Sequence, residues 1–331
     1  MANFAKTLDW DAALDAVSKS KSVLLLAHVT PDADALGSAL GLAHALLELD
    51  KSVQVSVGEE GFQTPESLNF LPGVNLVVSP ENIVYPDLVI SCDVSSENRL
   101  GTLAGVMKNA KQSIAIDHHP SFTGFGLIHL VDPNAAATAE IVLNFVDRLG
   151  VELNGDIASL IYAGLATDTG SFKYQATTSE TMRAAARLLD AGIDHSGLAR
   201  LLFDDEPMTA ITMMGEAIGR AVLTKNAANG AGLVYTSISI AQRGNQSELA
   251  MERVIEAIRR TTEAEVAAVF KQADDGHWNV SLRSKTLLSV GEVALSLGGG
   301  GHRFAAGYST GASLADAIDQ LIAKLAEVAG N

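Results

Sequence analysis

The chain has 331 residues, 47% hydrophobic and 19% charged, a composition that excludes intrinsic disorder and collagen-like repetition. Lys and Arg total 23 against 39 Asp and Glu, and the formal net charge of −16 excludes broad, non-specific binding of long nucleic acids. The sequence has one cysteine, Cys92, and no apolar signal segment in Met1–Trp10. No apolar run approaches the ~18 residues of a membrane span. We therefore expect a cytoplasmic protein without a membrane partner.

Short apolar runs alternate with helical stretches between Ser22 and Pro133. Near-continuous apolar strands separated by helices predict a parallel sheet that is covered on both faces. A helix with an apolar face is expected just after Asp34, and the pattern turns mostly helical from Ala135 to about Leu223. The runs are SVLLLA at 22–27, SVQVSV at 52–57, DLVISCD at 87–93, SIAID at 113–117 and GLIHLV at 126–131.

A second, smaller α/β domain is predicted after the segment KNAANGAG at 225–232, whose composition is typical of a turn or linker. Its pattern predicts a strand from Leu233, a helix, a hairpin through Asp274-Asp275-Gly276, another helix, a glycine-rich loop and a final helix. At roughly 100–200 residues per domain, two domains are expected. We predict a first domain at 1–190, a helical linker at 191–231 and a second domain at 232–331.

The first chemical cluster is His28, Asp32 and Asp34, directly after the strand at 22–27 and directly before a helix. In an open α/β sheet this is the carboxyl edge, where ligands bind. Imidazole nitrogen and carboxylate oxygen can converge there on a hard or borderline cation. The alternative is a turn followed by a helix N-cap.

Further His and Asp residues follow other predicted element ends. Asp93 ends the strand at 87–93, Asp117-His118-His119 ends the strand at 113–117, and Asp168 ends a helix of small residues. Each could be an ordinary turn residue, but together they deliver His and Asp to one edge of the sheet. Because crowded carboxylates repel one another, the set fits two divalent cations.

The motifs HVTPDAD at 28–34, Asp93, DHH at 117–119 and TDTG at 167–170 resemble the DHH phosphoesterase superfamily. The run GGGGHR at 298–303, followed by FAAG, is similar to the signature of the DHH-associated C-terminal domain. The resemblance spans nearly the whole chain. It implies that 1–190 is the catalytic domain and 232–331 the substrate-binding domain, with the active site in the cleft between the two domains. Within the superfamily, the chain length and the pairing of these two domains are most similar to the nanoRNase A type, which hydrolyses short oligoribonucleotides and 3′-phosphoadenosine 5′-phosphate (PAP).

The resemblance implies a role for each residue. His28 and Asp32 would hold one metal ion, Asp34, His118 and Asp168 the other, and Asp93 would bridge both. Asp93, His118 and His119 would form the catalytic centre, with His119 facing the scissile phosphate. A ligand set without thiolate favours Mn²⁺ over a structural zinc ion, with Mg²⁺ or Co²⁺ as substitutes. The family also implies a homodimer.

Substrate binding is assigned to His119 and to two motifs in the second domain. Backbone N–H groups of a glycine run can approach a phosphate closely, and an adjacent His and Arg add charge and donors. Arg283-Ser284 closes a strand and matches an Arg-Ser pair of the family; its alternative is a solvated strand end. The predicted residues are Gly299, Gly300, Gly301, His302, Arg303, Arg283 and Ser284.

The sequence therefore predicts a two-metal manganese phosphoesterase. Its substrates would be short oligoribonucleotides or linear dinucleotides, cleaved to mononucleotides, and PAP, cleaved to AMP and phosphate. Two alternatives remain: a manganese-dependent inorganic pyrophosphatase, which shares the first domain, and a nucleotide-binding sensor without turnover. The GGGGHR run argues against the first, and the complete set of ligand positions argues against the second.

Overall fold

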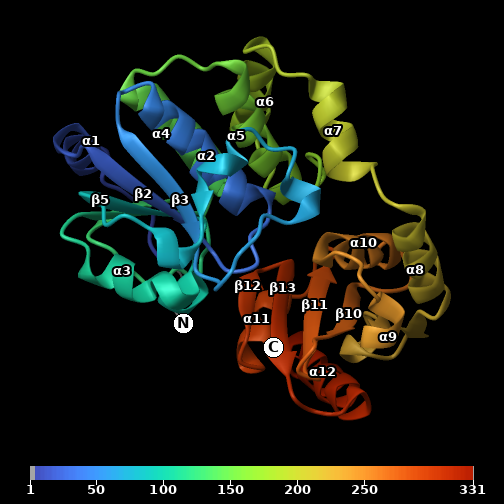
Figure 1. Cartoon of the computed structure of the whole chain (residues 1–331). Helices are drawn as coiled ribbons and strands as arrows, with labels where there is room; N and C mark the ends of the chain where they lie inside the picture. The colour runs from blue at the N-terminus through green and yellow to red at the C-terminus, as the bar shows by residue number, and fades with distance from the viewer. Residues whose placement is uncertain (1–3, 331) are drawn as a thin grey trace. The chain divides into compact units, whose positions relative to one another are not determined.

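Residues 4–330 are described in the computed structural model, and the chain divides into the units Met1–Asp205 and Glu206–Asn331 (Figure 1). Each unit is built on its own sheet, which confirms the predicted α/β class with a larger first part and a smaller second one. The chain passes from one unit to the other inside the predicted linker. The domain boundaries and the placement of the active site in a cleft stay predictions.

The first unit contains a seven-stranded sheet in the order β1-β7-β6-β5-β2-β3-β4. The strands β2 to β7 pair in parallel, and β1 pairs with β7 antiparallel. The strands are β1 (Thr7–Leu8), β2 (Ser22–Ala27), β3 (Ser52–Val57), β4 (Val77–Val78), β5 (Leu88–Cys92), β6 (Ser113–Asp117) and β7 (Ile128–Val131). The parallel sheet predicted from the apolar runs is confirmed.

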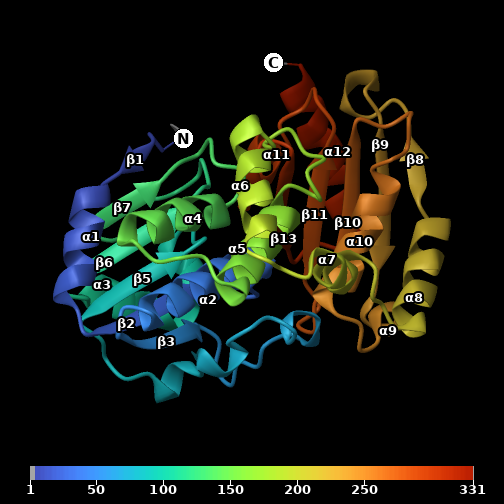
Figure 2. The same cartoon turned by 90° about the horizontal axis from the view of Figure 1, so that it is seen from above.

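Helices cover both faces of this sheet. Leu25 and Ile90 pack with α1, α2, α4 and α5 on one face, whereas Leu24 and Val89 pack with η4 and α3 on the other (Figure 2). Both faces of a strand are thereby buried, which explains its nearly unbroken apolar sequence. The helices are α1 (Trp10–Lys19), α2 (Ala33–Leu47), η1 (Glu66–Leu68), η2 (Val74–Leu76), η3 (Pro80–Asn82), η4 (Glu97–Leu103), α3 (Ala104–Asn109), α4 (Thr138–Leu149), α5 (Gly155–Asp168), α6 (Ser179–Asp190) and α7 (His195–Phe203).

The second unit contains a six-stranded sheet in the order β12-β13-β11-β10-β9-β8. Its strands are β8 (Val222–Thr224), β9 (Leu233–Ile238), β10 (Val266–Gln272), β11 (Trp278–Ser284), β12 (Gly300–His302) and β13 (Ala305–Thr310), and only β9 and β10 pair in parallel among them. Its helices are α8 (Met208–Gly219), η5 (Ala228–Gly230), α9 (Ile240–Arg243), α10 (Glu248–Ile258), α11 (Val290–Ser296) and α12 (Leu314–Ala329). The sheet lies between α11 with α12 and α8 with α10 (Figure 2).

The predicted hairpin between β10 and β11 is confirmed, with Gly276 in the left-handed region of its turn. The prediction of a plain glycine-rich loop was wrong for Gly300–His302, which forms β12 and pairs with β13. Glycine carries no strand preference, so the pattern does not indicate a strand there. Among residues 4–330, no helix is long and apolar enough to cross a lipid bilayer.

Candidate active site and metal centre

Three neighbouring strands deliver polar side chains to one edge of the first sheet. His28 follows β2, Asp93 follows β5, and Asp117 is the last residue of β6. From β2 the chain first runs to β3 and β4 on one side and then returns to β5 on the other. The edge between β2 and β5 is therefore a topological switch point, the place where open α/β sheets bind ligands.

Helix ends bring three more carboxylates to this edge. Asp32 is the N-cap of α2, where one of its oxygens accepts hydrogen bonds from the N–H groups of Asp34 and Ala35. Asp34 lies in the first turn of α2 and is fully buried. Asp168 is the last residue of α5. The capping interpretation of Asp32 is confirmed, and it leaves the second oxygen of that carboxylate facing His28.

The side chains converge around Asp93. Its carboxylate lies 3.6 Å from Nε2 of His28 and 3.6 Å from Nε2 of His118. Nε2 of His118 also lies 3.1 Å from Asp168 and 4.0 Å from Asp34, and Nε2 of His28 lies 3.8 Å from Asp32.

Besides the group of Asp93, Asp117 and His119, two groups of three residues have ligand atoms within 4.8 Å of one another: His28, Asp32 and Asp93, and Asp34, Asp93 and His118. Asp93 belongs to both groups, which is the position that a ligand shared by two ions requires. The donor set of imidazole and carboxylate fits a pair of divalent cations.

Burial and mutual charge shift the pKa values of these groups strongly. Burial alone lowers the pKa of His28, but the nearby carboxylates of Asp32 and Asp93 outweigh it and raise that pKa to about 10. The pKa of His118 is also raised, because its contact with Asp168 outweighs the effect of burial. For Asp93, burial favours the neutral acid, but the neighbouring histidines hold its pKa well below the usual value. Burial and the neighbouring carboxylates also raise the pKa values of Asp34 and Asp168, so the cluster as a whole holds protons tightly.

Buried hydrogen bonds hold the carboxylates in place. Asp34 accepts from the N–H groups of Thr138 and Ala139 at 2.7 and 2.9 Å, and from the hydroxyl of Ser38 at 3.1 Å. These N–H groups open α4, whose N-cap, Ala137, has no side-chain oxygen. The hydroxyl of Thr138 donates to Asp93 at 2.7 Å. Sequence reasoning missed Thr138, because a Thr beside a helix start is ordinarily a cap.

The role of Asp117 was also missed. Its two oxygens lie 2.8 Å from Nδ1 and 3.2 Å from the backbone nitrogen of His119. The ring of His119 is thereby oriented next to Asp93, at 3.6 Å. A carboxylate that orients a functional imidazole is a recurring feature of catalytic and metal sites. The signal was present in the sequence, since Asp117 is the first residue of the DHH triplet.

In the second unit, Arg283 and Ser284 make internal contacts. The guanidinium of Arg283 lies 3.1 Å from Glu252 and 3.4 Å from Glu256. Although burial favours the neutral acid, Lys271 and Arg283 lower the pKa of Glu252 to about 2. Ser284 is 1% exposed and its hydroxyl donates to the carbonyl of Leu288. A direct contact of Ser284 with a substrate would require that bond to break, and the substrate roles of both residues stay predictions.

The glycine run forms the outer hairpin of β12 and β13. A Cβ on Gly299 would lie 2.1 Å from the carbonyl oxygen of Gly307, and one on Gly301, at φ +136°, would lie 2.6 Å from Ala306. Tight backbone packing therefore already requires these two glycines, and Gly300 lies between them. His302 is half-buried in β12, and Arg303 follows it, exposed and 5.1 Å from the ring of Phe304. The hairpin presents a cation at its tip.

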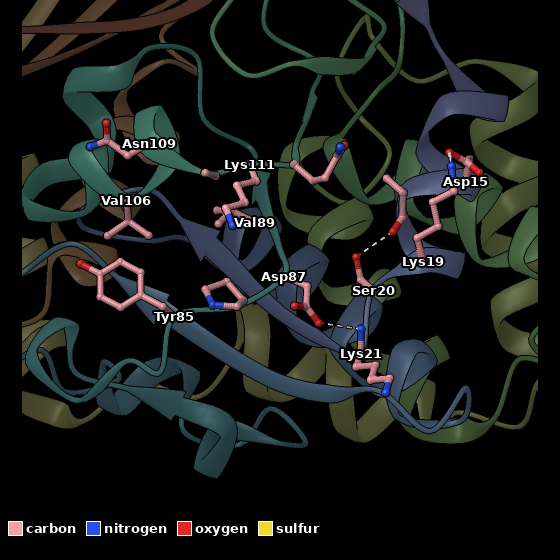
Figure 3. Close-up of a pocket in the computed structure, with 14 residues that line it drawn as sticks. Asp15, Lys19, Ser20, Lys21, Tyr85, Asp87, Val89, Val106, Asn109 and Lys111 are labelled. Atoms are coloured by element: carbon pink, nitrogen blue, oxygen red, sulfur yellow. Dashed lines mark hydrogen bonds and ion pairs between the residues drawn. The ribbon is translucent and has the colours of Figure 1, made fainter.

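A pocket of about 730 Å³ lies at the opposite end of the first sheet, where β2, β5 and β6 begin (Figure 3). Two of its acidic side chains already have partners: Asp15 pairs with Lys19, and Asp87 accepts from the backbone N–H groups of Lys21 and Ser22. The His and Asp cluster at the other edge of the sheet remains the candidate active site.

Comparison with known proteins gives matches over most of the chain. Residues 22–165 match the DHH family, N-terminal domain, and residues 230–331 match the DHHA1 domain. A bifunctional oligoribonuclease and PAP phosphatase of Thermus thermophilus is 33% identical, over 92% of this chain and 89% of the relative. A probable enzyme of the same name from Streptococcus mutans is 31% identical, over 87% and 89%.

The fold has a counterpart among solved structures. The crystal structure of an exopolyphosphatase-related protein from Bacteroides fragilis matches with a TM-score of 0.86 at 22% identity, covering 97% of this chain and 96% of that one. At this identity the match establishes the shared fold.

Proposed function

Because the chain belongs to the DHH family of phosphoesterases, with a DHH domain followed by a DHHA1 domain, we propose that it is a two-metal, manganese-dependent hydrolase of short RNA and small nucleotides. Its proposed reactions are the cleavage of oligoribonucleotides and linear dinucleotides to mononucleotides, and of PAP to AMP and phosphate. The observation that carries the proposal is Asp93, whose carboxylate is common to the group with His28 and Asp32 and to the group with Asp34 and His118.

In this proposal, His28 and Asp32 hold one ion, Asp34, His118 and Asp168 hold the other, and Asp93 contacts both. Nitrogen and oxygen ligands without thiolate suit Mn²⁺. Two such ions lower the pKa of a water molecule and stabilise the charge that develops on the phosphoryl oxygens. Buried carboxylates support this assignment, since their mutual repulsion is relieved by divalent cations.

The chain's own groups then orient the substrate. His119, whose ring is fixed by Asp117, is proposed to contact the scissile phosphate. The hairpin with His302 and Arg303 is proposed to hold a second phosphate, together with Gly299, Gly300 and Gly301, and Arg283 and Ser284 complete this part of the site. With a net charge of −16, the protein offers local cationic groups rather than a long basic surface, which favours short substrates.

The family resemblance also leads us to propose a homodimer. A cytoplasmic location stays a prediction from the sequence.

The test is hydrolysis by metal-stripped protein to which Mn²⁺ is returned, with PAP, a 5′-phosphorylated diadenylate, a long RNA and pyrophosphate offered in parallel. We expect turnover of PAP and the diadenylate, its loss with a chelator, and little cleavage of the long RNA. Turnover of pyrophosphate alone would replace the proposal with a pyrophosphatase. Metal and nucleotide binding without hydrolysis would replace it with a sensor.

A further inference from the structure

An arginine outside the metal-binding motifs reaches the candidate metal centre. Nη2 of Arg99 lies 2.8 Å from Nδ1 of His28, on the side of the ring away from Asp32 and Asp93. The arginine belongs to η4, which follows β5 and Asp93, and its side chain is half-buried. The site thus contains a strong cation that the family motifs did not point to.

The backbone around Arg99 is anchored to the ends of two strands. The carbonyl of Arg99 accepts from the N–H of Val29, directly after His28, and Thr102 N–H donates to the carbonyl of Gly58, directly after β3. A Cβ on Gly58 would lie 1.9 Å from the carbonyl oxygen of Leu100, so the two segments pack backbone against backbone. Such close packing fixes where the Arg99 side chain begins.

Nδ1 of His28 has two polar neighbours at the same distance. Nδ1 of His28 lies 2.8 Å from the carbonyl oxygen of Val29 as well as 2.8 Å from Arg99. A ring nitrogen can donate to the carbonyl or accept from the guanidinium, but it cannot do both. When Nε2 is a metal ligand, the other ring nitrogen carries the proton and donates, commonly to a backbone carbonyl. Nδ1 of His28 then donates to the carbonyl of Val29 and offers no lone pair to the guanidinium of Arg99 beside it.

We propose that Arg99 binds a phosphoryl group of the substrate in the metal-loaded enzyme. This inference rests on the proposed function. The guanidinium of Arg99 lies beside the candidate metal centre, where Asp32 and Asp93 would be engaged as ligands, and an incoming phosphate would supply an acceptor. The planar guanidinium suits two parallel hydrogen bonds to phosphate oxygens. Arg99 would contact the substrate and is in this sense a catalytic residue, held beside His28 by the backbone hydrogen bonds of its segment.

The test compares Arg99→Gln and Arg99→Lys with the wild-type protein. Calorimetry measures the affinity for Mn²⁺ and, on Mn²⁺-loaded protein, the affinity for AMP. We expect Arg99→Gln to retain Mn²⁺ affinity and to weaken AMP binding about 10- to 100-fold, the loss of a hydrogen-bonded charge. Arg99→Lys should recover part of that loss, because it restores the charge without the planar geometry.

Arg187→Gln is the matched control, because Arg187 pairs with Asp147 on exposed helices and lies outside the candidate site. It should leave both affinities unchanged. Weaker Mn²⁺ binding by Arg99→Gln with unchanged AMP affinity of the loaded protein would overturn the proposal and leave Arg99 as a support for His28.

Wild-type turnover of PAP is measured beside these titrations. Wild-type turnover together with unchanged AMP binding in Arg99→Gln would reject the assignment of Arg99 alone. A wild-type protein without turnover would reject the proposed function itself.

Discussion

At the scale of single residues, the carboxylates of the candidate site each satisfy more than one partner. Asp32 caps α2 with one oxygen and faces His28 with the other, and it remains 56% exposed. Asp34 is buried and caps α4, more than a hundred residues further along the chain. The hydrogen bonds therefore fix the orientation of both carboxylates, and they leave one oxygen of Asp32 without a capping role. Support of this kind orients ligands and is typical of metal sites.

Replacing Asp93 with Ala tests the shared ligand. Because this carboxylate belongs to both groups of potential ligands, its removal should reduce kcat by at least about 100-fold while the fold is retained. Turnover is measured with PAP, and circular dichroism checks the fold. Retention of more than a few per cent of wild-type activity would contradict a two-metal site.

Replacing Thr138 with Val tests the support of Asp93. The change removes the hydroxyl that donates to Asp93 at 2.7 Å but keeps the shape of the buried side chain. We expect activity to fall about 10-fold, as for other groups that orient metal ligands. Thr138→Ser keeps a hydroxyl and should retain most of the activity. Equal activity of the two variants would show that the hydrogen bond does not matter.

At the scale of elements, the packing of α2 against α5 places Asp34. Glycines allow the helices to approach closely: a Cβ on Gly37 would lie 2.5 Å from the carbonyl oxygen of Leu160, and one on Gly164 would lie 2.5 Å from Oδ1 of Asp34. Gly in a helix interior costs roughly 0.5–1 kcal/mol relative to Ala. Glycine is nevertheless required at these two positions, because a larger residue would displace the helix or the carboxylate.

Gly164→Ala should therefore damage the metal site. The added methyl group collides with Asp34, so we expect Mn²⁺ affinity to drop about 10-fold or more, together with a lower Tm. Gly155→Ala, at the start of the same helix, adds a methyl group with nothing within 4 Å and should change neither quantity. Calorimetry and thermal denaturation give the two readouts. Wild-type metal affinity in Gly164→Ala would mean that Asp34 is not a ligand.

The hairpin of β12 and β13 gives a second prediction at this scale. If exposed Arg303 binds a phosphate that is not cleaved, Arg303→Ala should raise KM by about 10-fold and change kcat little. Arg260→Ala removes another exposed arginine of the same unit and serves as the control. Steady-state kinetics with PAP distinguishes the cases, and an unchanged KM would exclude Arg303 from the site.

At the scale of the whole molecule, the candidate site links stability to pH and to metal. The protonated histidines stabilise the metal-free protein through the buried carboxylates, since the pKa of His28 rises from 6.5 to about 10 on folding. A raised folded pKa gives stability that is complete below the unfolded value and is lost as the pH rises toward the folded one. Histidines that ligate metal must instead give up these protons.

We therefore predict that the Tm of the metal-free protein falls as the pH is raised from 6.5 toward 10, and that Mn²⁺ binds more tightly over the same rise. Thermal denaturation at several pH values measures the first effect, and calorimetry in buffers of different ionisation enthalpy measures proton release. In His28→Gln the decline in Tm should be shallower. If the Tm of His28→Gln fell with pH as steeply as that of the wild type, His28 would not be the group that causes the decline.

The sequence by itself determined the α/β class, the parallel sheet and the strand ends that carry His28, Asp93 and the DHH triplet. These features depend on local patterns, because apolar runs specify buried strands and polar residues must follow where a strand leaves the core. The hairpin of β10 and β11 was predictable for the same reason, from its turn residues.

Only the tertiary structure decided which groups support that edge. Thr138 meets Asp93, the start of α4 meets Asp34, and Arg99 meets His28 across separations of 45 to 105 positions in the chain. Local preferences assign Thr138 to a helix start and Arg99 to a surface turn, since neither pattern contains its distant partner. Hydrogen bonds between remote segments form only when helix packing and strand order bring those segments together. They therefore cannot be predicted from any one stretch of sequence.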